Sequence, residues 1–317
     1  MKYPVFDLHC DTVLGLMGKD LLTDGSLRQN NLHIDLERAK GFAGYAQCFA
    51  CFTTPSDQYP QGKSVEDIFE LELSVLLREI NAHSDLICQA YTAEDIENNL
   101  KDGKMSAILT IEGPAGFGFD PDLLENLYQI GFRITTLGWN ERNVLTGSNV
   151  TGGGLTALGR EYVKKAQDFG MIVDVSHISD EAFWDIMDIT RSPIIASHSN
   201  SRHVCAHKRN LTDDMFLAIC KTGGVAGVNL YTDFLGENAD LDTVCDHVFH
   251  FLELDPDGKH ISLGGDLDGC DTLPKGFCGI QSYTDLAERL VQRGLSEPMI
   301  HNIFWNNALG VIKSCCI

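Results

Sequence analysis

The sequence predicts an α/β fold, a (β/α)8 barrel of the TIM type, on three observations. Short apolar runs alternate with amphipathic helical patterns along the chain, which is typical of parallel strands connected by helices. The alternative is an open doubly wound sheet, but no G-x-G-x-x-G motif follows the first apolar run. No low-complexity stretch, long linker or obvious repeat divides the 317 residues, so we expect a single domain over residues 1–317.

Eight apolar runs have the length expected of buried parallel strands. They lie at residues 5–9, 45–52, 107–112, 133–137, 172–175, 193–197, 225–230 and 261–265. Five segments between them have helical patterns, at residues 64–82, 155–170, 179–188, 211–224 and 282–294. Ser64 is a suitable N-cap for the first of these helices, and Gly170 and the pair Gly223-Gly224 suit the C-terminal ends of two others.

The composition excludes several classes of protein. An apolar fraction of 44% is enough for a packed core, and a net charge of −21 argues against binding to nucleic acid or to anionic membranes. The first residues, "MKYPVFDLHC", show no signal-peptide pattern, and no apolar run has membrane length. We therefore expect a cytoplasmic protein, unless a leader was removed. The eleven cysteines are scattered along the chain and are expected to be reduced.

Polar side chains suited to metal binding stand at the ends of five predicted strands. They are His9, Asp11, Glu112, His177, His198 and Asp266. A single histidine at such a place is often a hydrogen-bonded rim residue, but six such groups gather where barrel enzymes place their catalytic residues. Three imidazoles and three carboxylates suit zinc or a similar ion and exceed the needs of one tetrahedral site. Two bridged ions polarise a carbonyl and generate hydroxide near neutral pH, so the pattern predicts a hydrolase of amide bonds.

Longer motifs carry a family resemblance. The segments "DLHCDT", "IEG", "GLTALGREYVKKAQDFGMIVDVSHIS", "PIIASHSNSRHVCAHKRNLTDD", "GGVAGVNLY" and "LGGDLDG" occur in this order between residue 5 and about residue 269. Together they resemble the membrane (renal-type) dipeptidase family of metallopeptidases, peptidase family M19, within the amidohydrolase-type barrels. The "DVSHIS" and "ASHSNSR…KRN" segments are the most specific, whereas "HxD" alone is weak.

The resemblance implies a role for each strand-end residue. His9 and Asp11 would bind one divalent ion, His177 and His198 the other, and Glu112 would bridge the two, which are expected to be zinc. Asp266 would handle the proton of the bridging water. Arg209 would hold the substrate carboxylate, a task that suits its planar guanidinium, and Tyr231 would assist. The family also tolerates D residues at the C-terminal position, so L,D-dipeptides are expected among the substrates.

One segment departs from the family pattern. Many members have "LTLTH" where this sequence reads "ITTLGWNERN", and the histidine of that motif is thought to stabilise the tetrahedral intermediate. Trp139 or Asn140 would have to replace it as a neutral hydrogen-bond donor.

Other polar residues are given no place in the site. His33 and Asp35 repeat the HxD spacing but precede a helix start, and His301 lies in a late amphipathic helix. Asp268 and Asp271 are expected to shape the loop after the last strand. His203 and His207 flank Arg209 as surface or supporting residues, and Cys10 is expected to be a core residue.

The predicted function is hydrolysis of dipeptides by a binuclear zinc enzyme. An alternative is another binuclear amidohydrolase, such as a deacylase of N-acyl amino acids, which would need a different acyl pocket. A non-catalytic metal-dependent binding protein ranks last, since no ligand position is lost. The expected partners are small dipeptides, with neither nucleic acid nor membrane, and a homodimer is the candidate assembly.

Overall fold

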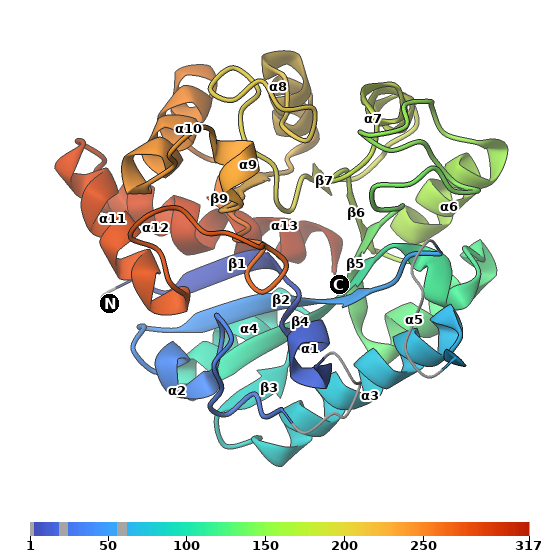
Figure 1. Cartoon of the computed structure of the whole chain (residues 1–317), viewed down its shortest axis with the longest axis horizontal. Helices are drawn as coiled ribbons and strands as arrows, with labels where there is room; N and C mark the ends of the chain where they lie inside the picture. Colours follow the sequence, from blue (N-terminus) through green and yellow to red (C-terminus); the bar gives the residue numbers. More distant parts are fainter. Residues whose placement is uncertain (1–2, 19–24, 56–61, 317) are drawn as a thin grey trace.

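The computed structural model describes residues 3–18, 25–55 and 62–316, and its strands form a barrel surrounded by helices (Figure 1). Eight strands follow the order β7-β6-β5-β4-β2-β1-β9-β8, and all their pairings are parallel. A parallel bridge between Ala196 and Ala226 joins the two ends of this order. The predicted (β/α)8 barrel is therefore confirmed. Its strands are β1 (Val5–Cys10), β2 (Tyr45–Phe52), β4 (Met105–Glu112), β5 (Phe132–Thr136), β6 (Ile172–Asp174), β7 (Ile194–Ile195), β8 (Ala226–Val228) and β9 (Ile261–Leu263).

One further strand, β3 (Ile87–Gln89), was not predicted. It pairs with the first half of β4, from Met105 to Ala107, whereas β5 pairs with β4 only from Leu109 onward. This short strand thus occupies the edge of β4 that β5 leaves open. Three residues with one exposed side chain are too few to show a strand period in the sequence.

Helices follow the strands on the outside of the barrel, and all five predicted helical segments are present. Ser64 caps α3 in a reciprocal capping box with Asp67, and Gly223 ends α8 in the left-handed conformation. Within the described ranges, no helix is long and apolar enough to span a membrane. The helices are α1 (Thr12–Met17), α2 (Leu36–Ala39), α3 (Val65–Ala82), α4 (Ala93–Lys101), α5 (Leu124–Ile130), α6 (Ala157–Asp168), α7 (Asp180–Met187), α8 (Asp213–Thr222), α9 (Thr232–Leu235), α10 (Leu241–Leu254), α11 (Tyr283–Gln292), α12 (Glu297–His301) and α13 (Asn307–Cys315).

Two clusters of buried apolar side chains hold the layers together. The larger one includes side chains from strands and from most of the surrounding helices. The smaller one joins strand residues such as Ile108 and Ile172 to Trp305, Val311 and Ile312 of the C-terminal helical segment. The C-terminal helical segment therefore packs onto the barrel strands.

Glycines allow close main-chain contact where β7, β8 and β9 meet. A Cβ atom on Gly227 would lie 2.0 Å from the carbonyl oxygen of Ser197, and one on Gly264 would lie 1.7 Å from the same atom. Both distances are far shorter than van der Waals contact. Any larger residue must push the strand ends apart.

We expect Gly227→Ala to lower the free energy of unfolding by about 1–3 kcal/mol, the usual range for forced overpacking. Gly310→Ala is the matched control, because its Cβ would meet no atom within 4 Å and the residue lies in α13. That variant should be neutral or more stable by about 0.5–1 kcal/mol. Urea denaturation followed by circular dichroism measures both. Equal stability of the two variants would contradict this account of the barrel seam.

Candidate metal centre and active site

Two buried aspartates fix the strand ends beneath the predicted ligands. Oδ1 of Asp7 accepts hydrogen bonds from the backbone amides of His9 and Gly265, both at 3.0 Å, and Tyr283 donates to its other oxygen. Burial raises the pKa of Asp7, and these hydrogen bonds oppose the shift. The first carboxylate thereby ties the end of β1 to the end of β9.

Asp174 performs the same task on the other side of the barrel. Its Oδ1 accepts from the backbone amides of Ser176 and Ser197, both at 2.9 Å. These two residues immediately precede His177 and His198. The second carboxylate therefore sets the positions from which both histidines extend.

Glu112, the last residue of β4, lies among three histidines. Its Oε2 is 3.3 Å from Nε2 of His9, and its Oε1 is 3.1 Å from Nε2 of His177 and 3.7 Å from Nε2 of His198. All four side chains are buried. One carboxylate therefore faces ligands from three other strand ends, as a bridging group must.

Asp11 and Asp266 complete the group on the side of His9. Nε2 of His9 is 3.5 Å from Oδ2 of Asp11 and 3.9 Å from Oδ1 of Asp266. The pairing of β1 with β2 shifts register between Asp7 and Cys10, so simple strand alternation does not by itself bring His9 and Asp11 together. Cys10 is buried in the core, as predicted.

Outer hydrogen bonds orient two of the imidazoles. Nδ1 of His177 lies 3.2 Å from Oδ1 of Asn140, and Nδ1 of His198 lies 2.6 Å from Oγ of Ser197, which itself donates to Asp174. Because an amide oxygen only accepts, the Nδ1 atom of His177 carries the proton, and its Nε2 is left as a ligand atom. The two Nε2 atoms face each other at 2.9 Å.

The unsatisfied atoms at the centre fit a bound cation. Nε2 of His9 and Oδ1 of Asp11 are buried without a hydrogen-bond partner. His9, Glu112 and His198 bring ligand atoms within 4.8 Å of one another, and so do His9, Asp11 and Asp266. These two sets of side chains, which have His9 in common, offer the imidazole nitrogens and carboxylate oxygens that zinc and similar divalent ions prefer.

Burial governs the protonation of these groups. It raises the pKa of Glu112 to about 7 and that of Asp266 to about 6. Burial alone would lower the pKa of His9, but Glu112 and Asp11 raise it well above its usual value. Burial, Arg209 and His9 lower the pKa values of His177 and His198. Without a cation, the centre therefore retains protons that a metal ion must displace.

Two of the predicted site residues have a left-handed backbone conformation. The φ angle is 70° at His177 and 56° at Asp266. Such conformations cost about 1–3 kcal/mol each in residues other than glycine and persist where the surrounding structure imposes them. Local sequence gave no sign of either angle.

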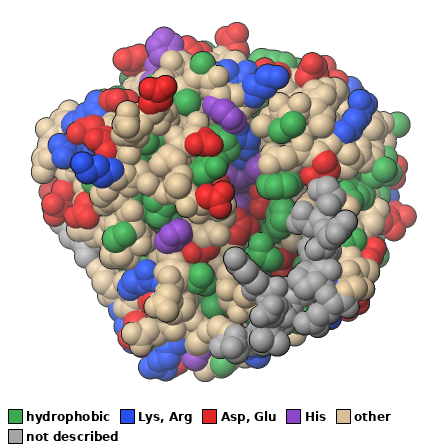
Figure 2. All heavy atoms as spheres, in the orientation of Figure 1, with side chains coloured by type: hydrophobic (Ala, Val, Ile, Leu, Met, Phe, Trp, Pro, Cys, Tyr) green, Lys and Arg blue, Asp and Glu red, His purple; other side chains and the backbone are tan. Residues whose placement is uncertain are grey.

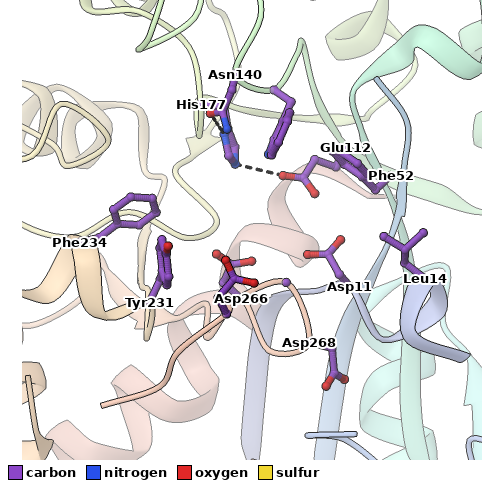
Figure 3. Close-up of a pocket in the computed structure, with 13 residues that line it drawn as sticks. Asp11, Leu14, Phe52, Glu112, Asn140, His177, Tyr231, Phe234, Asp266 and Asp268 are labelled. Carbon is purple, nitrogen blue, oxygen red and sulfur yellow. Dashed lines mark hydrogen bonds and ion pairs between the residues drawn. The ribbon is translucent and has the colours of Figure 1, made fainter. Parts of the chain in front are cut away.

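The centre opens into a cavity of about 350 Å³. Figure 3 shows Tyr231 and Phe234 on one side of it and Leu14 and Phe52 on the other, with Glu112, Asp11 and Asp266 between them. Trp139 and Asn140 also line the cavity. In the space-filling view, acidic and histidine side chains gather around a hollow near the middle of this face (Figure 2). A cavity of this size suits a small ligand.

Arg209 lies near the centre but is not among the residues that line this cavity. Its side chain is buried, Nη1 donates to Oγ of Ser199 at 2.7 Å, and its Cζ atom lies 5.5 Å from the centre of the Phe234 ring. Nε and Nη2 have no hydrogen-bond partner. A buried guanidinium with free donors is suited to binding an anion.

Asn229 is among the residues of this region that the sequence analysis missed. Nδ2 of Asn229 donates to Oδ2 of Asp266 at 3.0 Å and also contacts the carbonyl oxygen of His198 at 3.2 Å. The sequence signal that could have found Asn229 is its position at the end of an apolar run, two residues before Tyr231. Asp35 caps α2 and remains outside the centre, as predicted.

Comparison with known proteins agrees with this geometry. The model of the membrane dipeptidase family, peptidase family M19, matches residues 1–315. The chain belongs to this family.

Individual relatives support the assignment. An uncharacterized dipeptidase of Schizosaccharomyces pombe is 37% identical over 217 residues, which are 66% of this chain and 53% of that relative, so the match spans about half of its length. A second uncharacterized dipeptidase of this yeast is 30% identical over 300 residues, 89% of this chain and 72% of the relative. A metallopeptidase of Rhodobacter sphaeroides, solved with a phosphinate mimic of the dipeptide L-Ala-D-Ala, superposes with a TM-score of 0.87 at 26% identity, over 99% of this chain and 100% of the other.

We expect the affinity for divalent metal ions to fall as the pH drops below about 7. Glu112 then gains a proton, His9 already holds one because its pKa is raised well above its usual value, and each proton that an ion displaces lowers the apparent affinity about tenfold per pH unit. Zinc titration against a competing chromophoric chelator between about pH 5.5 and 8 measures this dependence. An affinity that stays constant over this range would show that the centre carries no displaceable protons.

Proposed function

We propose that this chain is a dipeptidase that uses two zinc-type divalent ions. The observation that carries the proposal is the position of Glu112, whose two oxygens face His9 on one side and His177 and His198 on the other. The family match supports dipeptide hydrolysis. The cytoplasmic location and the homodimer expected from the sequence remain predictions.

The proposed ligands divide between two positions. His9 and Asp11 would hold one ion, His177 and His198 the other, and Glu112 would contact both. When bound, the ions would polarise the scissile carbonyl and lower the pKa of water. The protein holds the ligands in place through Asp7, Asp174 and the hydrogen bonds to the imidazoles.

Asp266 is the proposed proton acceptor. Its Oδ1 faces His9, while Asn229 holds its other oxygen, so one oxygen remains directed at the centre. A carboxyl group in this position can take a proton from the attacking water and return it to the leaving amine.

Arg209 is the proposed anchor for the free carboxylate of the substrate. Its two unpartnered nitrogens supply the donors, and Tyr231 lies on the same side of the cavity as Phe234, over which Arg209 extends. This anchor would restrict substrates to short peptides. The L-Ala-D-Ala mimic bound by the Rhodobacter sphaeroides relative supports a preference that includes L,D-dipeptides.

Trp139 is the proposed donor to the developing oxyanion. Asn140 is engaged with His177 through its side-chain oxygen, so we assign it to the orientation of this ligand. The indole of Trp139 lines the cavity and packs edge-on against Phe52 at 5.3 Å between ring centres. The indole of Trp139 is neutral between about pH 5 and 8, whereas the histidine that other family members have at this position can change its charge in that range.

The first test is a substrate panel with the metal-reconstituted enzyme. We expect hydrolysis of L,L- and L,D-dipeptides, little hydrolysis of N-acyl amino acids, and about two ions per chain by elemental analysis. Asp266→Asn, purified in parallel, controls for contaminating peptidases and should lose about 10²–10⁴-fold in kcat. Full activity with one ion per chain would contradict the two-ion proposal, and a preference for N-acyl amino acids would favour the deacylase.

A second test addresses the carboxylate anchor. Arg209→Ala should reduce kcat/KM for dipeptides by the equivalent of about 2–4 kcal/mol, the value of a charge-assisted, bidentate contact. Dipeptide amides have no carboxylate, so the same substitution should affect them little. Equal losses on both substrates would mean that Arg209 acts elsewhere.

A third test separates the roles of Trp139 and Asn140. Trp139→Phe keeps the aromatic wall and removes the donor, and we expect a fall in kcat of about 10²–10³-fold. Asn140→Ala should instead weaken metal binding, since it frees the imidazole of His177. An unchanged kcat in Trp139→Phe, together with a large fall in metal-saturated Asn140→Ala, would transfer the donor role to Asn140.

A further inference from the structure

A second group of metal-binding side chains lies outside the centre. It consists of His203, in the loop between β7 and α8, Asp213, the first residue of α8, and His250, on α10. Ligand atoms of these three residues lie within 4.8 Å of one another. The group shares no residue with the proposed catalytic centre.

In this group, carboxylates hold the ring of His250, whereas the ring of His203 is exposed to solvent. Nε2 of His250 is 2.9 Å from Oδ1 of Asp213, and Nδ1 of the same ring is 3.4 Å from Oε2 of Glu253. The ring of His203 stacks on that of His250 at 4.3 Å between centres, with only 5° between the planes. His250 is buried, whereas His203 is exposed. Solvent can therefore reach the group from the side of His203.

These donors match a particular class of ion. Two imidazole nitrogens and one carboxylate oxygen suit zinc, copper or nickel, and water can complete the coordination of an exposed site. Two parallel rings cannot both direct a lone pair at one ion in their own planes, so His203 must turn when an ion binds. Its exposed position on a loop allows this rotation. Nε2 of His250 must release the proton that it donates to Asp213, while Glu253 at Nδ1 keeps the ring in place.

Charges near the group also permit a cation. Arg202 is adjacent in sequence to His203, but its guanidinium is bound to Asp180 by hydrogen bonds of 2.7 and 2.8 Å. The carboxylates of Asp213 and Glu253 both face His250. An incoming divalent ion would thus meet the carboxylate of Asp213, with that of Glu253 on the other side of the His250 ring.

We propose that His203, Asp213 and His250 form a further binding site for a zinc-type divalent ion, which ties the loop between β7 and α8 to α10. This loop also carries Arg209, so the site lies on the segment that would position the substrate carboxylate. The metal site itself does not depend on the proposed dipeptidase activity.

The test uses the enzyme already loaded at its centre, with Zn²⁺ alone as the probe in isothermal titration calorimetry. We expect one additional ion per chain in the unaltered protein, and at least tenfold weaker binding of that ion in His203→Ala. Hydrogen exchange of residues 201–211 should slow when the additional ion binds. Since His203 is exposed, its replacement should leave the fold and the basal hydrolysis of dipeptides unchanged.

Two further variants make the outcome decisive. Asp213→Asn should weaken the additional binding as His203→Ala does, whereas His301→Gln, a histidine on α12 outside the group, should bind like the unaltered protein. Thermal denaturation verifies that each variant is folded. The proposal is overturned if no additional ion binds, or if folded His203→Ala and Asp213→Asn bind it as tightly as the unaltered protein does.

Discussion

The contacts of Glu112 with three histidines constrain the whole barrel. They require the ends of β1, β4, the segment after β6 and the segment after β7 to meet at one level. A shift of one residue in the pairing of β4 would turn Glu112 away from the centre, because neighbouring residues of a strand face opposite sides. The register of the strands and the geometry of the site therefore cannot vary independently.

Buried carboxylates provide the framework for this arrangement. Asp7 and Asp174 accept hydrogen bonds from main-chain amides and do not pair with positively charged side chains in the described part of the chain. Each carboxylate links two neighbouring strand ends. Hydrogen bonds to a charged acceptor are stronger than those between neutral groups, especially away from water. The backbone can consequently hold left-handed conformations at His177 and Asp266, which an isolated chain would avoid.

The sequence predicted most of the fold because each barrel strand is a short apolar run that ends in polar or glycine residues. It also predicted that six polar side chains would meet at one rim, since a parallel barrel brings all strand ends together there, and their roles as ligands remain predictions. The outer contacts could not be predicted in this way. Asn140 meets His177, and Asn229 meets Asp266, across 37 residues of chain in each case, and neither contact has a local pattern. Arg209 is buried next to the ring of Phe234, and this contact also depends on how the loops pack, which has no local sequence pattern.

The pairing of β1 with β9 has a consequence for synthesis of the protein. Asp7 and Gly265, which it binds, are 258 positions apart in the chain. At about 5–20 residues per second, roughly 13–50 s pass between the translation of the two residues. During this interval one edge of the first strand lacks its partner, and unpaired strand edges promote association between chains. Nascent chains of this protein are therefore most exposed to aggregation, and to binding by chaperones, before the ninth strand leaves the ribosome.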